Sequence, residues 1–191
     1  LRGTGKTAFA RAIAGELGLR SLSSHAARKS IFGDAKKRAA YGEGVYTAEA
    51  NRLTYRKLIE AAARALKNGR SVILDATFRA AASLATARSM AAEAGARWRF
   101  IECRLAPELV RARLAERASK KEGLSDATWE VYLRQREESA SLYAEPGADY
   151  LILDTSGSLA ATSRRASDWL RSSEEMGEEM GEEVEWTLLC L

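Results

Sequence analysis

LRGTGKT, the stretch at residues 1–7, decides the fold that this chain is expected to adopt. It matches the end of the phosphate-binding loop pattern G-x-x-x-x-G-K-[ST], with Gly5, Lys6 and Thr7 in the last three positions. The first glycine of the pattern would lie one position ahead of Leu1, and such a loop normally follows a buried strand. We therefore expect a fragment that lacks the strand before its loop.

The loop carries the first functional prediction. Backbone N–H groups of a glycine-rich turn bind phosphate oxygens, and the positive end of the following helix adds to the attraction. Lys6 is expected to reach the β- and γ-phosphates of a nucleotide, and the Thr7 hydroxyl is expected to bind Mg²⁺. The alternative is a glycine-containing helix start without a ligand. The predicted nucleotide-binding residues are Gly3, Thr4, Gly5, Lys6, Thr7 and Ala8.

Strand and helix patterns alternate along the rest of the chain. Compact apolar runs predict strands, and runs with apolar residues three or four apart predict helices between them. This alternation is typical of an α/β domain with a mostly parallel sheet. The predicted strands are LRSLSS (19–24), SVILD (71–75), WRFIECRL (98–105) and DYLILD (149–154), and the last helix covers 158–172.

Composition sets further limits. A length of 191 residues suits one domain with a sizeable core, and 46% hydrophobic and 29% charged residues are ordinary for a globular protein. No apolar run approaches the roughly 18 residues of a membrane span. Two cysteines are too few for a disulfide framework or a zinc cluster, which fits a reducing, cytoplasmic location.

Charge divides the chain into a basic body and an acidic tail. The net charge is +4, but without the seven glutamates that follow residue 173 it would be +11. So basic a body fits anionic ligands such as nucleotides or nucleic acid, and equally fits arginines on solvated helix faces. The predicted domain covers residues 1–172, and the repeat EEMGEEMG predicts a disordered tail over 173–191.

The apolar end of this tail, VEWTLLCL (184–191), differs from everything before it. It could take the place of the missing strand only by running parallel after a long acidic linker, which is an unfavourable connection. We therefore expect residues 1–191 alone to be unstable and to have little kinase activity.

Asp75 is the predicted metal ligand outside the loop. It ends the apolar run VILD, and the carboxyl ends of parallel strands face the crevice where α/β proteins bind ligands. Its carboxylate could hold Mg²⁺ directly or through water. The alternative is an acid that caps the next helix.

Several longer motifs carry a resemblance to a known family. GTGKT, SSHAARK, YGEGVYTAEANRLTY, GRSVILDATFR and ECRLAPELVRARLAERA occur in the order and spacing of a bacterial P-loop kinase-like ATP-binding family. Its members occur alone or behind an aminoglycoside-phosphotransferase-like domain, and they look like relatives of phage polynucleotide kinase, chloramphenicol phosphotransferase and zeta toxins. The resemblance covers about residues 1–155. It implies an adenylate-kinase-like parallel sheet with helices on both faces, in which the strand before the loop lies in the centre and is expected to be missing here. It also implies ATP and Mg²⁺ as cofactors and γ-phosphate transfer to a hydroxyl.

The resemblance also implies catalytic residues. Lys6 and Thr7 match the loop, Asp75 matches the D-A-T element, and Arg28 matches an arginine that follows an acidic residue by three positions. Here that acidic position is His25, so the carboxylate that activates the acceptor hydroxyl in the phage kinase relatives is missing. A neutral imidazole could act as the base instead, or His25 could be an exposed histidine after the helix cap Ser24.

A lid with arginines is implied around the polar turn SKKEG (119–123). Lid arginines supply positive charge around the transferred phosphate when the lid closes. Arg113 and Arg117 are four residues apart and so share a helix face, and Arg117 is the better candidate because it lies nearest the turn. The alternative is a set of solvated arginines paired with glutamates. The candidates are Arg111, Arg113, Arg117, Arg134 and Arg136.

Two functions therefore stay open. The first is an ATP-dependent kinase whose partner is a hydroxyl acceptor, either a small molecule or a nucleic-acid end. The second is a non-catalytic nucleotide-binding module that serves a fused upstream domain, which His25 favours. A mechanical or regulatory ATPase ranks last, because the chain shows no second arginine motif of the oligomeric ATPases.

Overall fold

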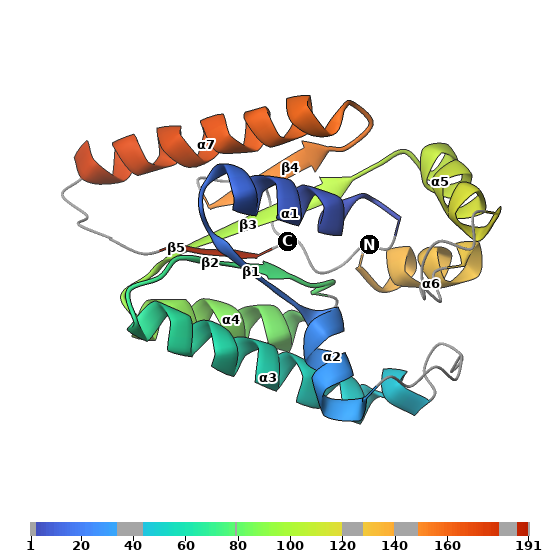
Figure 1. Ribbon diagram of the computed structural model, residues 1–191, viewed down its shortest axis with the longest axis horizontal. Helices are drawn as coiled ribbons and strands as arrows, with labels where there is room; N and C mark the ends of the chain where they lie inside the picture. The colour runs from blue at the N-terminus through green and yellow to red at the C-terminus, as the bar shows by residue number, and fades with distance from the viewer. Residues whose placement is uncertain are drawn as a thin grey trace.

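A single parallel sheet organises the protein (Figure 1). The computed structural model describes residues 3–33, 44–78, 80–119, 128–139, 149–179 and 187–190. The strand order within these residues is β1-β2-β5-β3-β4, and every neighbouring pair is parallel. The predicted α/β class and parallel sheet are thus confirmed. The strands are β1 (Arg20–Ser23), β2 (Val72–Asp75), β3 (Arg97–Arg104), β4 (Tyr150–Asp154) and β5 (Thr187–Cys190).

Helices cover both faces of this sheet. Figure 1 shows α1 (Lys6–Glu16) and α7 (Leu159–Glu179) on one face, with α3 (Ala48–Lys67) and α4 (Ala81–Glu93) on the other. The helix α2 (Ser24–Phe32) and the short 3₁₀ helix η1 (Gly44–Tyr46) contact α3. The remaining two helices, α5 (Pro107–Ser119) and α6 (Trp129–Ser139), lie together beyond the carboxyl ends of the strands (Figure 1).

Each face of the sheet has its own hydrophobic core. On the α3/α4 face, side chains such as Leu58, Leu66 and Phe100 pack together, and on the α1/α7 face Phe9 and Ile101 do so. All four side chains of β2 are buried, as expected for a strand covered on both sides. The two cores cover the sheet on both faces, and the predicted metal ligand Asp75 ends β2 at the carboxyl edge of the sheet.

The centre of the sheet differs from the sequence-based expectation. Strand β5 runs parallel between β2 and β3, with Leu188 opposite Val72 on one side and Trp98 on the other. It fills the place that the sequence analysis left open for a strand before the loop. The expected reason for instability, an unfilled centre, therefore does not hold in this structure.

The tail also differs in its described part. Helix α7 runs on to Glu179, past the predicted end at residue 172, and residues 187–190 form β5 where disorder was expected. Glutamate is a good helix former, so an acidic run can extend a helix that packing has already started.

Smaller predictions can be compared with the structure as well. Helix α2 begins at Ser24, and the cap is Ser23, whose hydroxyl accepts a hydrogen bond from Ala26 N at 3.1 Å. The lid turn predicted at residues 119–123 lies, from residue 120 onward, outside the described residues. No helix in the described ranges is long and apolar enough to cross a membrane.

Candidate functional site: a phosphate loop in a cationic cavity

A cavity of about 790 Å³ opens at the carboxyl edge of the sheet, a size typical of ligand sites. One wall is the start of α1, and another is built from α2, η1 and α3. The end of β2 and the start of α4 form the floor, and α5 and α6 each contribute a side chain. The residues lining it are Gly3, Gly5, Lys6, Thr7, Ala8, Arg11, Ser23, Ser24, His25, Arg28, Tyr46, Ala48, Asn51, Arg52, Tyr55, Asp75, Ala76, Thr77, Ala80, Ala82, Ser83, Arg117 and Gln135.

The predicted phosphate loop forms one end of this cavity. Gly3 and Gly5 have φ angles of 81° and 85°, a left-handed conformation that side-chain-bearing residues rarely adopt. Gly5 caps α1, so the loop leads directly into the helix start, where N–H groups attract anions. Five of the six predicted nucleotide-binding residues line the cavity. The sixth, Thr4, is buried at 1% exposure and is not among the lining residues.

Asp75 and Thr7 both line the cavity, Asp75 from the end of β2 and Thr7 from the first turn of α1. The register partner of Asp75 on β1 is Ser23, and the Ser24 hydroxyl donates to the Asp75 backbone oxygen at 3.3 Å. Helix α4 starts at Ala81 with Ala80 as its cap and has no side-chain cap hydrogen bond, so Asp75 does not cap that helix. The alternative given for Asp75 in the sequence analysis is therefore wrong.

A hydroxyl and a carboxylate are oxygen ligands of the kind that Mg²⁺ takes. Mg²⁺ commonly uses one or two protein oxygens and completes its shell with water and nucleotide phosphates. The pair Thr7 and Asp75 fits this pattern. Among the described residues there is no group of three or more histidine, cysteine or acidic side chains that could hold a metal by itself.

The α2 wall holds His25 and Arg28. His25 is exposed and lines the cavity in the first turn of α2, and that turn has no acidic residue. Arg28 donates to the Asn51 side-chain oxygen at 2.9 Å and to the Val45 carbonyl, and its guanidinium lies 5.0 Å from the Tyr46 ring centre. Arg28 is thus fixed against η1 and α3 with its charge on the cavity wall.

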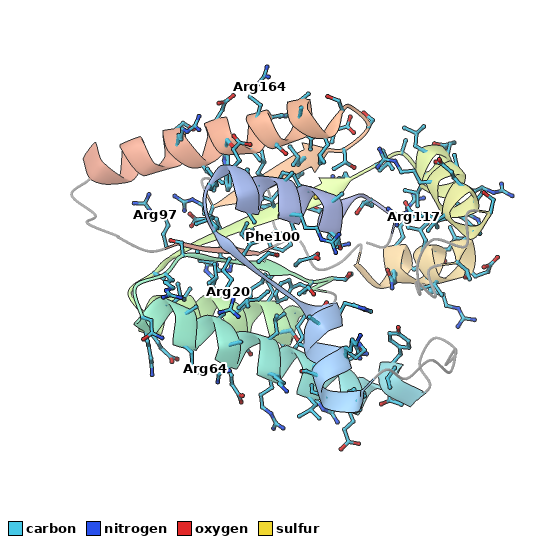
Figure 2. All side chains as sticks on the ribbon, in the orientation of Figure 1. Arg20, Arg64, Arg97, Phe100, Arg117 and Arg164 are labelled. Carbon is cyan, nitrogen blue, oxygen red and sulfur yellow. The ribbon has the colours of Figure 1, made fainter. Side chains whose placement is uncertain are left out.

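The lid arginines separate into different roles. Arg117 lines the cavity, and Figure 2 shows it among the lid helices at this end of the sheet. Arg113 is not a lining residue, because its guanidinium donates to the Thr155 carbonyl at 2.8 Å. Arg111 lies over the Trp129 ring at 5.8 Å, whereas Arg134 and Arg136 are exposed on α6 away from the lining.

Sequence reasoning missed several lining residues. The Tyr55 hydroxyl donates to the Thr77 carbonyl, and both residues line the cavity. Asn51 and Arg52 lie one turn before Tyr55, and no local pattern distinguishes them from solvated residues. Gln135 lies between two arginines on α6 and is 2% exposed. It is three residues from Tyr132, which is buried, and this helical spacing is the signal that could have indicated its buried position.

The cavity is strongly cationic. Asp75 is the only acid among its described lining residues, which also include one lysine and four arginines: Lys6, Arg11, Arg28, Arg52 and Arg117. An enclosed site with this balance concentrates anions. Of the two interpretations of the basic composition, anionic ligands thus gain support at this edge of the sheet.

Comparison with known proteins agrees with this geometry. A family model described as an AAA domain matches residues 1–142. A candidate kinase from Chloroflexus aurantiacus shares the fold at 20% identity and a TM-score of 0.64, over 89% of this chain and 92% of that one. An unliganded sugar kinase from Janibacter sp. HTCC2649 gives 22% identity and a TM-score of 0.65, over 90% of each chain. No curated protein matches the chain.

At these identities the two solved structures establish the fold alone. The family model covers most of the sequence, including the loop, β2 and the lid helices. The chain belongs to this AAA domain family and is a P-loop kinase-like nucleotide-binding domain.

Proposed function

We propose that this protein is an ATP-dependent phosphotransferase that moves the γ-phosphate of ATP to a hydroxyl of a small molecule or a nucleic-acid end. The observation that carries the proposal is the composition of one cavity. It brings the phosphate loop, Asp75 and a lid arginine together with a separate wall from α2 and α3 that is free for an acceptor.

In the proposed reaction the acceptor oxygen bonds to the γ-phosphorus, the bond to the bridging oxygen breaks, and ADP leaves. Lys6 binds the β- and γ-phosphates, and Arg117 adds positive charge where the transferred phosphate develops it. Thr7 and Asp75 are the residues that would hold Mg²⁺, which supplies charge stabilisation at the phosphate oxygens. His25 lines the cavity from α2, and in the proposed reaction it accepts the proton of the acceptor hydroxyl.

A second function, a nucleotide-binding module without catalysis, is favoured by one observation. The first turn of α2 has no acid, so the carboxylate expected in the phage kinase relatives is replaced by His25. Such a module would bind ATP through the same loop and leave the acceptor wall unused.

Titration calorimetry with Mg·ATP tests the shared part of both functions. Lys6→Ala should weaken binding at least tenfold, because it removes a charge-assisted contact to phosphate worth roughly 1.5–3 kcal/mol. Arg20→Ala serves as the control (Figure 2). It also removes one positive charge, but at the start of β1, where the amino ends of the strands lie, away from the cavity. Equal affinity of the wild type and Lys6→Ala would exclude the assigned loop.

ADP release measured with sugars, nucleosides and 5′-hydroxyl oligonucleotides then separates the two functions. Acceptor-dependent ADP supports the kinase. Tight ATP binding without acceptor-dependent ADP, together with activity gained in His25→Asp, would identify a binding module with a degraded catalytic position.

A further inference from the structure

Thr155 follows β4 and contacts three separate segments at the edge of the cavity. Its backbone N–H donates to the Arg104 carbonyl at the end of β3 at 2.9 Å. Its hydroxyl reaches the Thr4 carbonyl in the phosphate loop at 2.8 Å, and its own carbonyl accepts from Arg113 on α5 at 2.8 Å. One residue therefore joins the sheet, the loop and the first lid helix.

The Thr155 hydroxyl bridges the loop and the end of β3. It lies within hydrogen-bond distance of two carbonyl oxygens, that of Thr4 at 2.8 Å and that of Arg104 at 2.9 Å, and it has one proton to donate to them. Thr155 is 6% exposed and Thr4 is 1% exposed. Water has little access to replace a hydrogen bond lost between two such buried groups.

Arg113, which donates to the Thr155 carbonyl, also packs against the phosphate loop. While its Nη2 donates to Thr155, its Nη1 lies 3.4 Å from the position that a Cβ on Gly5 would occupy. A Cβ on Gly3 would come within 2.8 Å of the Val110 side chain. The loop is thus packed against α5, and the carbonyl of Thr155 fixes the cation in that packing.

We propose that Thr155 is a positioning residue: its hydroxyl holds the phosphate loop in the conformation that binds nucleotide, and its carbonyl keeps Arg113 against that loop. This inference rests on the proposed binding of ATP. It adds a residue outside the loop motif and outside the cavity lining, for which the sequence pattern offers no signal.

Three variants test it. Thr155→Val keeps the shape and removes the hydroxyl, and Thr155→Ser keeps the hydroxyl. Thr162→Val is the matched control, because Thr162 is equally buried at 6% and its hydroxyl donates to the carbonyl of Ser158, the residue just before α7, at 2.9 Å. By calorimetry, Thr155→Val should bind Mg·ATP about tenfold more weakly than the wild type. The serine variant and the control should bind as the wild type does.

Amide hydrogen exchange without nucleotide supplies a second measurement. Residues 3–8 should exchange faster in Thr155→Val than in Thr155→Ser or Thr162→Val, while β2 and α3 stay equally protected. A folded Thr155→Val protein with unchanged loop exchange and unchanged ATP affinity would overturn the inference. A wild-type protein that binds no ATP would defeat the proposed function, and the exchange comparison would still decide the role of Thr155.

Discussion

Deleting residues 187–191 should abolish the cooperative unfolding of this domain. The deletion removes β5, which joins the β1-β2 half of the sheet to the β3-β4 half. Without β5, backbone N–H and C=O groups on both β2 and β3 lose their hydrogen-bond partners. The removed strand also lies between Ile73 of β2 and Ile101 of β3, which are fully buried in the core on the α1/α7 face.

The size of the effect follows from the register. Three residues of β5 pair with β2, and four pair with β3. With about one hydrogen bond per pair and ~1 kcal/mol net for each, the ladder contributes roughly 7 kcal/mol. Domains of this kind are stable by only about 5–15 kcal/mol in total, so the remaining stability would be small or absent.

Urea unfolding followed by far-ultraviolet circular dichroism measures this effect. A chain that lacks only Leu191 is the control, because Cys190 is the last residue in the ladder. The control should unfold with the wild-type midpoint and slope, and the 1–186 chain should show no sigmoidal transition. If the 1–186 chain unfolds at the wild-type midpoint, β5 does not hold the sheet together and the pairing argument fails.

Three further outcomes follow from the site and the core. Asp75→Asn should lower turnover roughly 10²-fold or more in steady-state kinetics while changing the ATP dissociation constant little, since metal charge matters most in the transition state; unchanged turnover at saturating Mg²⁺ would make Asp75 structural. Arg117→Ala should slow phosphate transfer by a similar factor, because Arg117 lines the cavity. The control Arg134→Ala, on the exposed side of α6, should leave the rate unchanged. Equal rates for the two variants would show that Arg117 does not act on the transferred phosphate. Burial raises the pKa of the Cys103 thiol to about 11; in a Cys190→Ser background it should therefore resist thiol reagents at pH 8 until the protein unfolds. Because the unfolded thiol ionises first, near its ordinary value of 9.0, the free energy of unfolding should fall as the pH rises from 9.0 to about 11, and Cys103→Ala should lessen that fall.

Local patterns predicted much of this structure. The apolar runs that became β2, β3 and β4 were visible because parallel strands are buried on both faces. The loop and Asp75 were predicted from motif spacing and from the rule that ligands bind at the carboxyl ends of parallel strands, and Arg117 was predicted from the family resemblance. Asp75, Arg117 and most of the loop line one cavity, so these positions could be brought together without tertiary information.

What the sequence could not predict depends on contacts between distant segments. The short apolar end of the chain shows strand propensity, but nothing local says that it pairs with both β2 and β3. Arg113 and Arg117 share a helix face, and only the position of the Thr155 carbonyl separates the anchoring arginine from the one in the cavity. Thr155 itself lies in a connection without periodicity, where side-chain roles are set entirely by neighbours.

The place of β5 in the sheet also bears on the order in which the chain folds. Strands β1 and β2 can meet early in synthesis, and β3 can meet β4 once residue 154 has been made. The ladder between these two halves needs residues 187–190, so it closes only after those residues have been made. Contacts so distant in sequence form slowly, and until they form the edges of β2 and β3 are open to pairing with other chains. We expect the yield of soluble protein during expression to depend on synthesis rate and temperature more strongly than the stability of the folded domain would indicate.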